Sequence, residues 1–253
     1  MTIALFVLAG ASALRGTWSP CGLSMLSTIT PVSERARHHA YGRSSLWFVL
    51  GAVLGGATIG GAMAGGAWVT RQLALPAAVR IGVAVAVAGL ALAADARLGG
   101  LRLPERPRQV DASWVTRFRP WVYAGGFGWQ LGTGVATYVM TNGVYTMLVV
   151  GAVWLPPLQA LALGVVFGAC RGATILLGAA VTTPARLRAV HRWLASTDGA
   201  SLGVTLLAEL CFLAACLVRL GTTAAVVGGL FVLSLGVATV VRVHAQRTPV
   251  GAP

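Results

Sequence analysis

Long apolar runs, separated by short polar segments rich in arginine, make up almost the whole chain. A hydrocarbon layer about 30 Å thick is crossed by about 20 helical residues, and seven runs reach that length. These runs are residues 3–30, 45–68, 75–94, 120–149, 153–181, 200–218 and 222–241. The pattern therefore predicts an all-α integral membrane protein with seven transmembrane helices.

The composition argues against a soluble domain. Hydrophobic residues make up 57% of the 253 residues and charged residues 10%, with a mean hydropathy of +0.79, whereas soluble domains carry about 25% charged residues. All 19 basic residues are arginine and the net charge is +13, but a nucleic-acid partner would require a basic patch on a soluble surface. We therefore expect the lipid bilayer as partner, with no nucleic acid, cofactor or metal ion.

The arginines also predict the orientation. Arg71 and Arg219 lie on one side of the predicted membrane, with Arg80 close to that side. Fourteen arginines lie on the other, in residues 31–44, 95–119, 182–199 and 242–253. Because short cytoplasmic loops carry the excess of basic residues, we expect a multi-pass protein of the inner (cytoplasmic) cell membrane with its N-terminus outside and its C-terminus in the cytoplasm.

Two segments of the chain match each other. Residues 50–55 (LGAVLG) read like residues 163–168 (LGVVFG), and the charge count gives their halves opposite orientations. This predicts an inverted repeat of three plus three helices followed by a seventh helix. The predicted parts are the first repeat 1–95, a basic cytoplasmic connector 96–119, the second repeat 120–218, and the extra helix with its tail 219–253.

The first and fourth predicted helices contain residues that break helices. Proline removes a helix hydrogen bond, glycine lowers helix stability, and inverted repeats place their working site near the midplane on broken helices. The predicted lining of the two breaks is Pro20, Gly22, Thr28, Pro31, Gly128, Trp129, Gly132, Gly134 and Thr137. The alternative is a pair of kinked packing helices. Packing is also the first interpretation for the small residues Gly51, Gly55, Gly56, Gly60, Gly61 and Gly65, which let helices approach closely.

The first break also carries a family resemblance. Residues 6–10 (FVLAG), 19–23 (SPCGL) and Pro31, with residues 128–135 (GWQLGTGV), resemble the membrane domains of the CcdA and DsbD family. The resemblance implies a fold of six helices, thiol chemistry at Cys21 that moves reducing equivalents, and a thioredoxin-like partner on either side of the membrane. Gly132 stands where that family has its second cysteine. Cys170 is a possible substitute if its Cα lies within about 7 Å of that of Cys21.

Three charged residues fall inside predicted helices: Arg15, Arg171 and Glu209. Ionisable residues at bilayer depth are costly and therefore candidates for function. In a structural interpretation Glu209 neutralises Arg171. In a functional one an arginine holds an anionic solute or favours the reactive thiolate of Cys21.

Three functions are therefore open. The first is a CcdA/DsbD-like transporter of reducing equivalents through Cys21. The second is a relative without redox activity that transports a small anionic or sulfur-containing solute, and the third is a non-catalytic membrane helper subunit.

Overall fold

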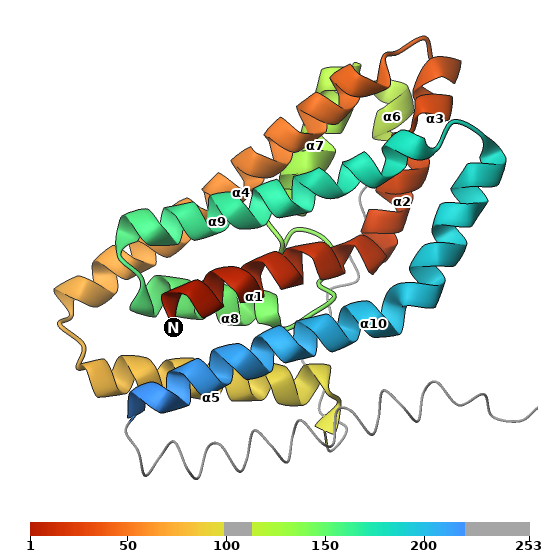
Figure 1. Cartoon of the computed structure of the whole chain (residues 1–253). Helices are drawn as coiled ribbons and strands as arrows, with labels where there is room; N and C mark the ends of the chain where they lie inside the picture. Colours follow the sequence, from red (N-terminus) through yellow and green to blue (C-terminus); the bar gives the residue numbers. More distant parts are fainter. Residues whose placement is uncertain (99–112, 221–253) are drawn as a thin grey trace, which may run out of the picture.

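The computed structural model describes residues 1–98 and 113–220, and the elements in these ranges are helices joined by short turns (Figure 1). In the first half they are α1 (Thr2–Arg15), η1 (Gly16–Trp18), α2 (Pro20–Thr28), α3 (Pro31–Ala36), α4 (Tyr41–Gln72) and α5 (Ala77–Asp95). In the second half they are α6 (Trp114–Arg117), α7 (Pro120–Gly132), α8 (Gly143–Trp154), α9 (Pro157–Ala173), η3 (Thr174–Ala180), α10 (Pro184–Leu217) and η4 (Val218–Leu220).

Four helical segments of the described ranges are long and apolar enough to cross a membrane. They are α4, α5, α9 continued by η3, and α10 continued by η4. The protein is thus an all-helical membrane protein. The seven continuous spans are not found, because the first and fourth predicted spans are each divided in two. The predicted seventh span, residues 222–241, and most of the predicted connector 96–119 lie outside the described residues.

The first interruption follows directly from the sequence around Ser19. The helix α1 ends at Arg15, η1 follows, and Ser19 is extended, with φ −71° and ψ 156°. Pro20 begins α2, where its missing N–H is no loss. The Ser19 hydroxyl accepts the Gly22 N–H at 3.0 Å, which is an N-cap bond. A new helix therefore starts at Pro20 instead of α1 continuing.

The second interruption separates α7 from α8. The helix α7 ends at Gly132, and an irregular stretch of residues 133–142 leads to Gly143, the first residue of α8. Gly134 has a φ of +72°, which residues with a side chain rarely adopt. The glycine therefore lets the backbone turn away from the axis of α7.

Glycines of α4 bring three helices into backbone contact. A Cβ on Gly51 would lie 2.0 Å from the carbonyl oxygen of Gly125 in α7, and one on Gly56 would lie 2.2 Å from that of Gly164 in α9. These distances leave no room for a side chain. Residues along α4 meet α9 in descending order, so these two helices are antiparallel, and the two matched segments 50–55 and 163–168 lie on them.

The packing interpretation holds for some of the predicted glycines only. A Cβ would be too close to a neighbouring helix at Gly51, Gly55, Gly56 and Gly60, but it would meet nothing within 4 Å at Gly61 and Gly65.

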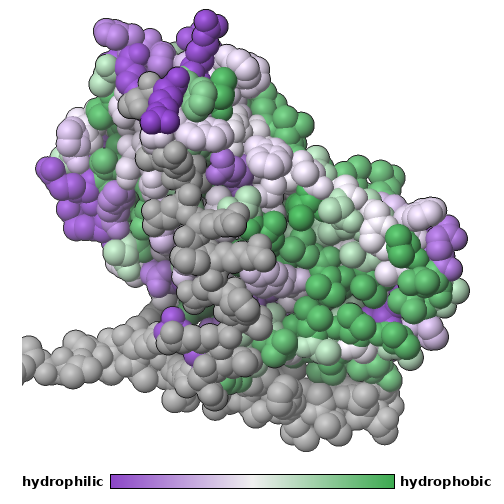
Figure 2. Space-filling model, turned by 180° about the vertical axis from the view of Figure 1, so that it is seen from behind, coloured by the Kyte–Doolittle hydropathy of each residue, from purple (hydrophilic) through white to green (hydrophobic). Residues whose placement is uncertain are grey.

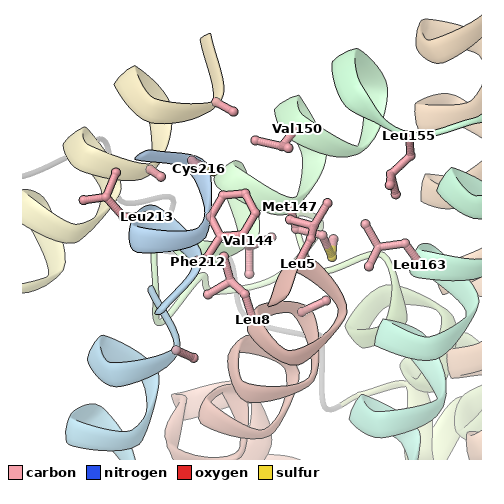
Figure 3. Close-up of a cluster of buried hydrophobic side chains, with 14 of the residues drawn as sticks. Leu5, Leu8, Val144, Met147, Val150, Leu155, Leu163, Phe212, Leu213 and Cys216 are labelled. Atoms are coloured by element: carbon pink, nitrogen blue, oxygen red, sulfur yellow. The ribbon is translucent and has the colours of Figure 1, made fainter. Parts of the chain in front are cut away.

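Buried apolar side chains form two clusters. The first, shown in Figure 3, joins α1, α4, α5, α8, α9 and α10 and includes Leu5, Leu8, Met147, Leu163 and Phe212. The second joins α2, α4 and α7 and includes Cys21, Leu26, Phe48, Tyr123 and Leu131. The first half of the chain therefore contributes to both clusters, through α1 and through α2 with α4.

The outer surface is divided between apolar and basic regions. Figure 2 shows hydrophobic residues over much of the visible face and hydrophilic residues gathered toward one end. Large side chains such as Leu54, Trp68 and Leu207 are exposed, as lipid-facing residues are. Exposed arginines concentrate near the first residues of α4, α7 and α10, namely Arg43, Arg117, Arg119, Arg186 and Arg188.

Candidate functional site

Arg15 lies at the end of α1 and contacts the middle of α10. Its buried Nη1 donates to the main-chain oxygen of Asp198 at 3.0 Å and to its carboxylate at 2.6 Å. Ser201 Oγ accepts from the same nitrogen. A buried cation requires a counter-charge, and the half-exposed Asp198 carboxylate supplies it. The ion pair therefore ties α1 to α10.

Arg171, near the end of α9, reaches the last turn of α1. Its Nη1 donates to the main-chain oxygen of Ala13 at 3.1 Å, and the carbonyl end of a helix favours a positive charge. The guanidinium fills the space beside Gly16 and also interacts electrostatically with Cys21. Within the described ranges no carboxylate forms an ion pair with it.

Asp95 and Glu209, hereafter the acidic pair, meet between α5 and α10. Their carboxyl groups share a neighbour, because Thr141 Oγ1 lies 2.5 Å from Asp95 Oδ2 and 3.2 Å from Glu209 Oε1. Two neighbouring carboxylates repel each other, which disfavours the doubly ionised state, so the pair carries one negative charge when one of the two carboxyl groups keeps its proton. Glu209 is 2% exposed, and the ion pairs found in the described residues do not include either acid.

The start of α8 stabilises the remaining charge. The Asn142 N–H donates to the Asp95 carboxylate oxygens at 3.0 and 2.9 Å, and the Asn142 side-chain amide and the Thr141 hydroxyl also donate to it. Thr141 Oγ1 lies 3.2 Å from Glu209 Oε1 and accepts the Gly143 N–H at 3.1 Å. The amides of a helix start have no partner within the helix and attract anions. The break between α7 and α8 therefore supplies the hydrogen-bond donors that hold the acidic pair.

Two polar atoms at this place have no hydrogen-bond partner among residues 1–98 and 113–220. They are Glu209 Oε2 and Ser12 Oγ. Ser12 Oγ and Glu209 Oε1 lie 2.5 and 3.1 Å from the position that a Cβ on Gly143 would take, and a methyl carbon of Leu8 lies 3.1 Å from it. The buried serine hydroxyl of α1 therefore points to the acidic pair.

The structure does not pair Arg171 with Glu209, and Cys21 and Cys170 are not joined by a disulfide. Glu209 contacts Asp95 and Thr141, whereas Arg171 caps α1, so the predicted Arg171–Glu209 pair is not formed. Cys21 belongs to the second apolar cluster and Cys170 packs against the first. None of the four cysteines forms a disulfide.

The residues predicted to line the first break lie at two turns, the one before α2 and the one between α2 and α3. Pro20 starts α2, Gly22 packs against the main-chain oxygen of Thr17, and Pro31 starts α3. The main-chain oxygen of Thr28 accepts hydrogen bonds from Ser33 and Arg37. Pro20 and Gly22 therefore belong to the turn between α1 and α2, and Thr28 and Pro31 to the turn between α2 and α3.

The residues predicted to line the second break have mixed positions. Gly128 and Gly132 pack against main-chain oxygens of α4, and Gly134 against the Phe167 ring. Thr137 is buried, with no hydrogen-bond partner for its hydroxyl in the part of the chain that the structure describes. Trp129 is partly exposed and donates to Thr58 at 3.2 Å, which places it on the outside of the bundle.

Sequence reasoning missed a second buried carboxylate. Glu34 of α3 is fully buried and accepts hydrogen bonds from the Tyr123 hydroxyl at 2.8 Å, from Ser44 at 2.5 Å and from Arg37 at 2.9 Å. It is the single acid in residues 31–44, beside three arginines, and this charge balance was the available signal. Asp95 was missed too, because it follows the last residue of a predicted span.

The fold and this site define a class: a polytopic helical membrane protein with a buried acidic pair at a helix break. The chain is similar to proteins named Methylamine utilization protein MauF. Identity is 31% over 157 residues in Paracoccus versutus, covering 57% of this chain and 53% of the relative. It is 33% over 152 residues in Methylophilus methylotrophus, covering 55% and 49%, and 32% over 161 residues in Paracoccus denitrificans, covering 56% and 53%.

The chain spans about half the length of these curated relatives. No family model and no solved structure matches it.

These relatives overturn the family assignment made from the sequence. They are named for methylamine utilization and not for the CcdA and DsbD family, so the assignment to that family and to cytochrome c biogenesis is wrong. The thiol transporter that followed from it is wrong as well, and the two alternatives, a solute transporter and a helper subunit, have no support. The short motifs around Pro20 and Gly132 that carried the resemblance serve here as helix breaks and packing positions.

Proposed function

We propose that this protein acts in methylamine utilization as an integral membrane protein, and that the acidic pair is its working centre. The similarity to the methylamine utilization proteins of three organisms carries the first part of the proposal. The proposal for the centre rests on Glu209, a carboxyl group buried within a candidate membrane span without an ion-pair partner in the described residues. Placing an ionisable group inside the membrane costs free energy, and such groups therefore mark functional sites of membrane proteins.

The arrangement in the membrane is part of the same proposal. Helices of the two halves form an inverted repeat over residues 1–95 and 120–218, with residues 219–253 adding a further helix. The basic residues at the starts of α4, α7 and α10 face the cytoplasm, and the N-terminus lies outside. The antiparallel contact of α4 with α9 supports this arrangement, because the second helices of inverted halves run in opposite directions.

Gene deletion in the native host tests the proposal. The deletion strain should grow poorly with methylamine as the nitrogen source and normally with ammonium, and the wild-type gene should restore growth on methylamine. Equal growth of the deletion strain and the wild type on methylamine would refute the role.

A variant of the acidic pair tests its part in that role. The gene carrying Glu209→Gln should fail to restore growth, whereas Cys211→Ser, at an exposed position of the same helix, should restore it. If both genes restore growth, the acidic pair is not the centre.

A further inference from the structure

The acidic pair has fewer hydrogen-bond partners than a purely structural contact would have. A buried polar atom without a hydrogen bond costs about 1–3 kcal/mol, and here both Glu209 Oε2 of α10 and Ser12 Oγ of α1 lack one among the described residues. Ser12 Oγ and the other carboxylate oxygen, Glu209 Oε1, both lie against Gly143. Structural carboxylates in this protein are instead saturated, as Glu34 is with Tyr123, Ser44 and Arg37. The contrast indicates that the oxygens at the acidic pair have a ligand.

The charge of the site specifies that ligand. Asp95 and Glu209 both lie against Thr141 among helices whose buried side chains are apolar, and because neighbouring carboxylates repel each other, the pair carries a single negative charge when one of them keeps its proton. A single positive charge cancels it, whereas a divalent ion would leave a buried excess charge. The oxygens of Glu209 and Ser12 are hard ligands that suit alkali ions, and they also accept N–H bonds from an ammonium group.

We propose that Asp95, Glu209 and Ser12 form a binding site for one monovalent cation. The shared chemistry is a single positive charge held by carboxylate and hydroxyl oxygens. Na⁺ is the inorganic candidate for this cation. Protonated methylamine is the organic candidate, and the Leu8 side chain supplies an apolar neighbour to its methyl group. The choice of methylamine rests on the proposed function, whereas the cation site itself does not.

Ligand-induced stabilisation of the purified full chain tests the site. Unfolding is followed in detergent at constant ionic strength, with choline chloride as the background salt and NaCl, methylammonium chloride or MgCl₂ as the added ligand. Because a ligand that binds the folded state raises its stability with concentration, Na⁺ or methylammonium should raise the midpoint temperature in a saturable manner, and Mg²⁺ should not. Acidification that protonates the second carboxyl should abolish the effect.

Two variants make the test specific. Ser12→Ala removes a hydroxyl that has no hydrogen bond in the described residues, so the fold is kept and the apparent affinity for the cation should fall about 2- to 10-fold. Glu209→Gln removes the charge and should reduce it about 10- to 100-fold. Ser45→Ala, at a buried serine of α4 outside the site, should leave the affinity unchanged.

Each outcome decides between the alternatives. Stabilisation by Na⁺ alone identifies an inorganic ion, and stabilisation by methylammonium identifies the organic one. If neither ion stabilises the wild type, or if Glu209→Gln and Ser12→Ala bind as the wild type does, the cation site is refuted. A deletion strain that fails on methylamine while the protein binds no cation would overturn this inference alone, and cation binding with normal growth would overturn the proposed function alone.

Discussion

The guanidinium of Arg171 occupies the space that a side chain on Gly16 would need. A Cβ on Gly16 would lie 1.1 Å from Arg171 Nη1. The glycine at the end of α1 and the arginine near the end of α9 therefore fit together as a pair, and the absence of a side chain at residue 16 allows the buried cation to reach the Ala13 oxygen.

The first prediction concerns this pair. Gly16→Ala should displace Arg171 from its acceptor and lower the stability by about 3 kcal/mol, since overpacking is added to the loss of a buried charge contact. The midpoint of thermal unfolding in one detergent measures the effect. Gly10→Ala is the matched control in the same helix, because a Cβ there meets nothing within 4 Å, and it should be neutral or stabilise by up to about 1 kcal/mol.

A second prediction concerns the contact between α4 and α9. Gly56→Ala should destabilise the protein by about 2 kcal/mol or more, because its methyl group meets the backbone of Gly164 and Gly168 and pushes the helices apart. Gly61→Ala, five residues further along α4, meets nothing within 4 Å and should be tolerated. Equal unfolding midpoints of the two variants would contradict the close packing.

The third prediction tests the buried Glu34. Tyr123→Phe removes the hydroxyl that donates to this carboxylate and should cost about 1–3 kcal/mol, because a buried charged acceptor then lacks one donor. Tyr145→Phe is the control, since the Tyr145 hydroxyl has no hydrogen bond in the described ranges; its unfolding midpoint should stay near that of the wild type. A larger effect of the control would show that ring packing, and not the hydrogen bond, is measured.

The fourth prediction concerns orientation. In a background whose four cysteines are replaced by serine, Arg71→Cys should react with a membrane-impermeant maleimide in intact cells. Arg186→Cys should react only after the membrane is opened, because the proposed orientation places it in the cytoplasm. Both arginines are exposed, so the label reaches either position once it is on the correct side. The reverse labelling pattern would invert the proposed orientation.

Local chemistry explains what the sequence could predict of the fold. Pro20 breaks a helix through its own ring, and the glycines near Gly134 do so through their own backbone freedom, so both interruptions were visible in the residues that cause them. The membrane character was also predictable, because it depends on the summed hydropathy of each apolar run and not on contacts between distant residues. The number of continuous spans was not, since hydropathy counts an apolar run as one span even where a turn interrupts its helix.

The candidate site depends on contacts between residues that are distant in sequence. Asp95 meets Glu209 only because α5 and α10 pack against each other, and no spacing rule relates the two positions. Pairing Arg171 with Glu209 was reasonable on charge alone, but a buried guanidinium is also satisfied by carbonyl oxygens at a helix end. Arg15 likewise finds Asp198, which the sequence placed in a loop, because α10 continues through that region.

The glycine contacts of α4 have a mechanical consequence. Where backbone touches backbone, no side chain can change its rotamer to absorb a displacement, so the contacts of α4 with α7 and α9 resist displacement. The helices α1, α5, α8 and α10 are held together by Leu, Met and Phe side chains, which can repack around a displaced neighbour. The acidic pair lies among these helices. A change in its charge should therefore displace first the helices whose side chains can repack.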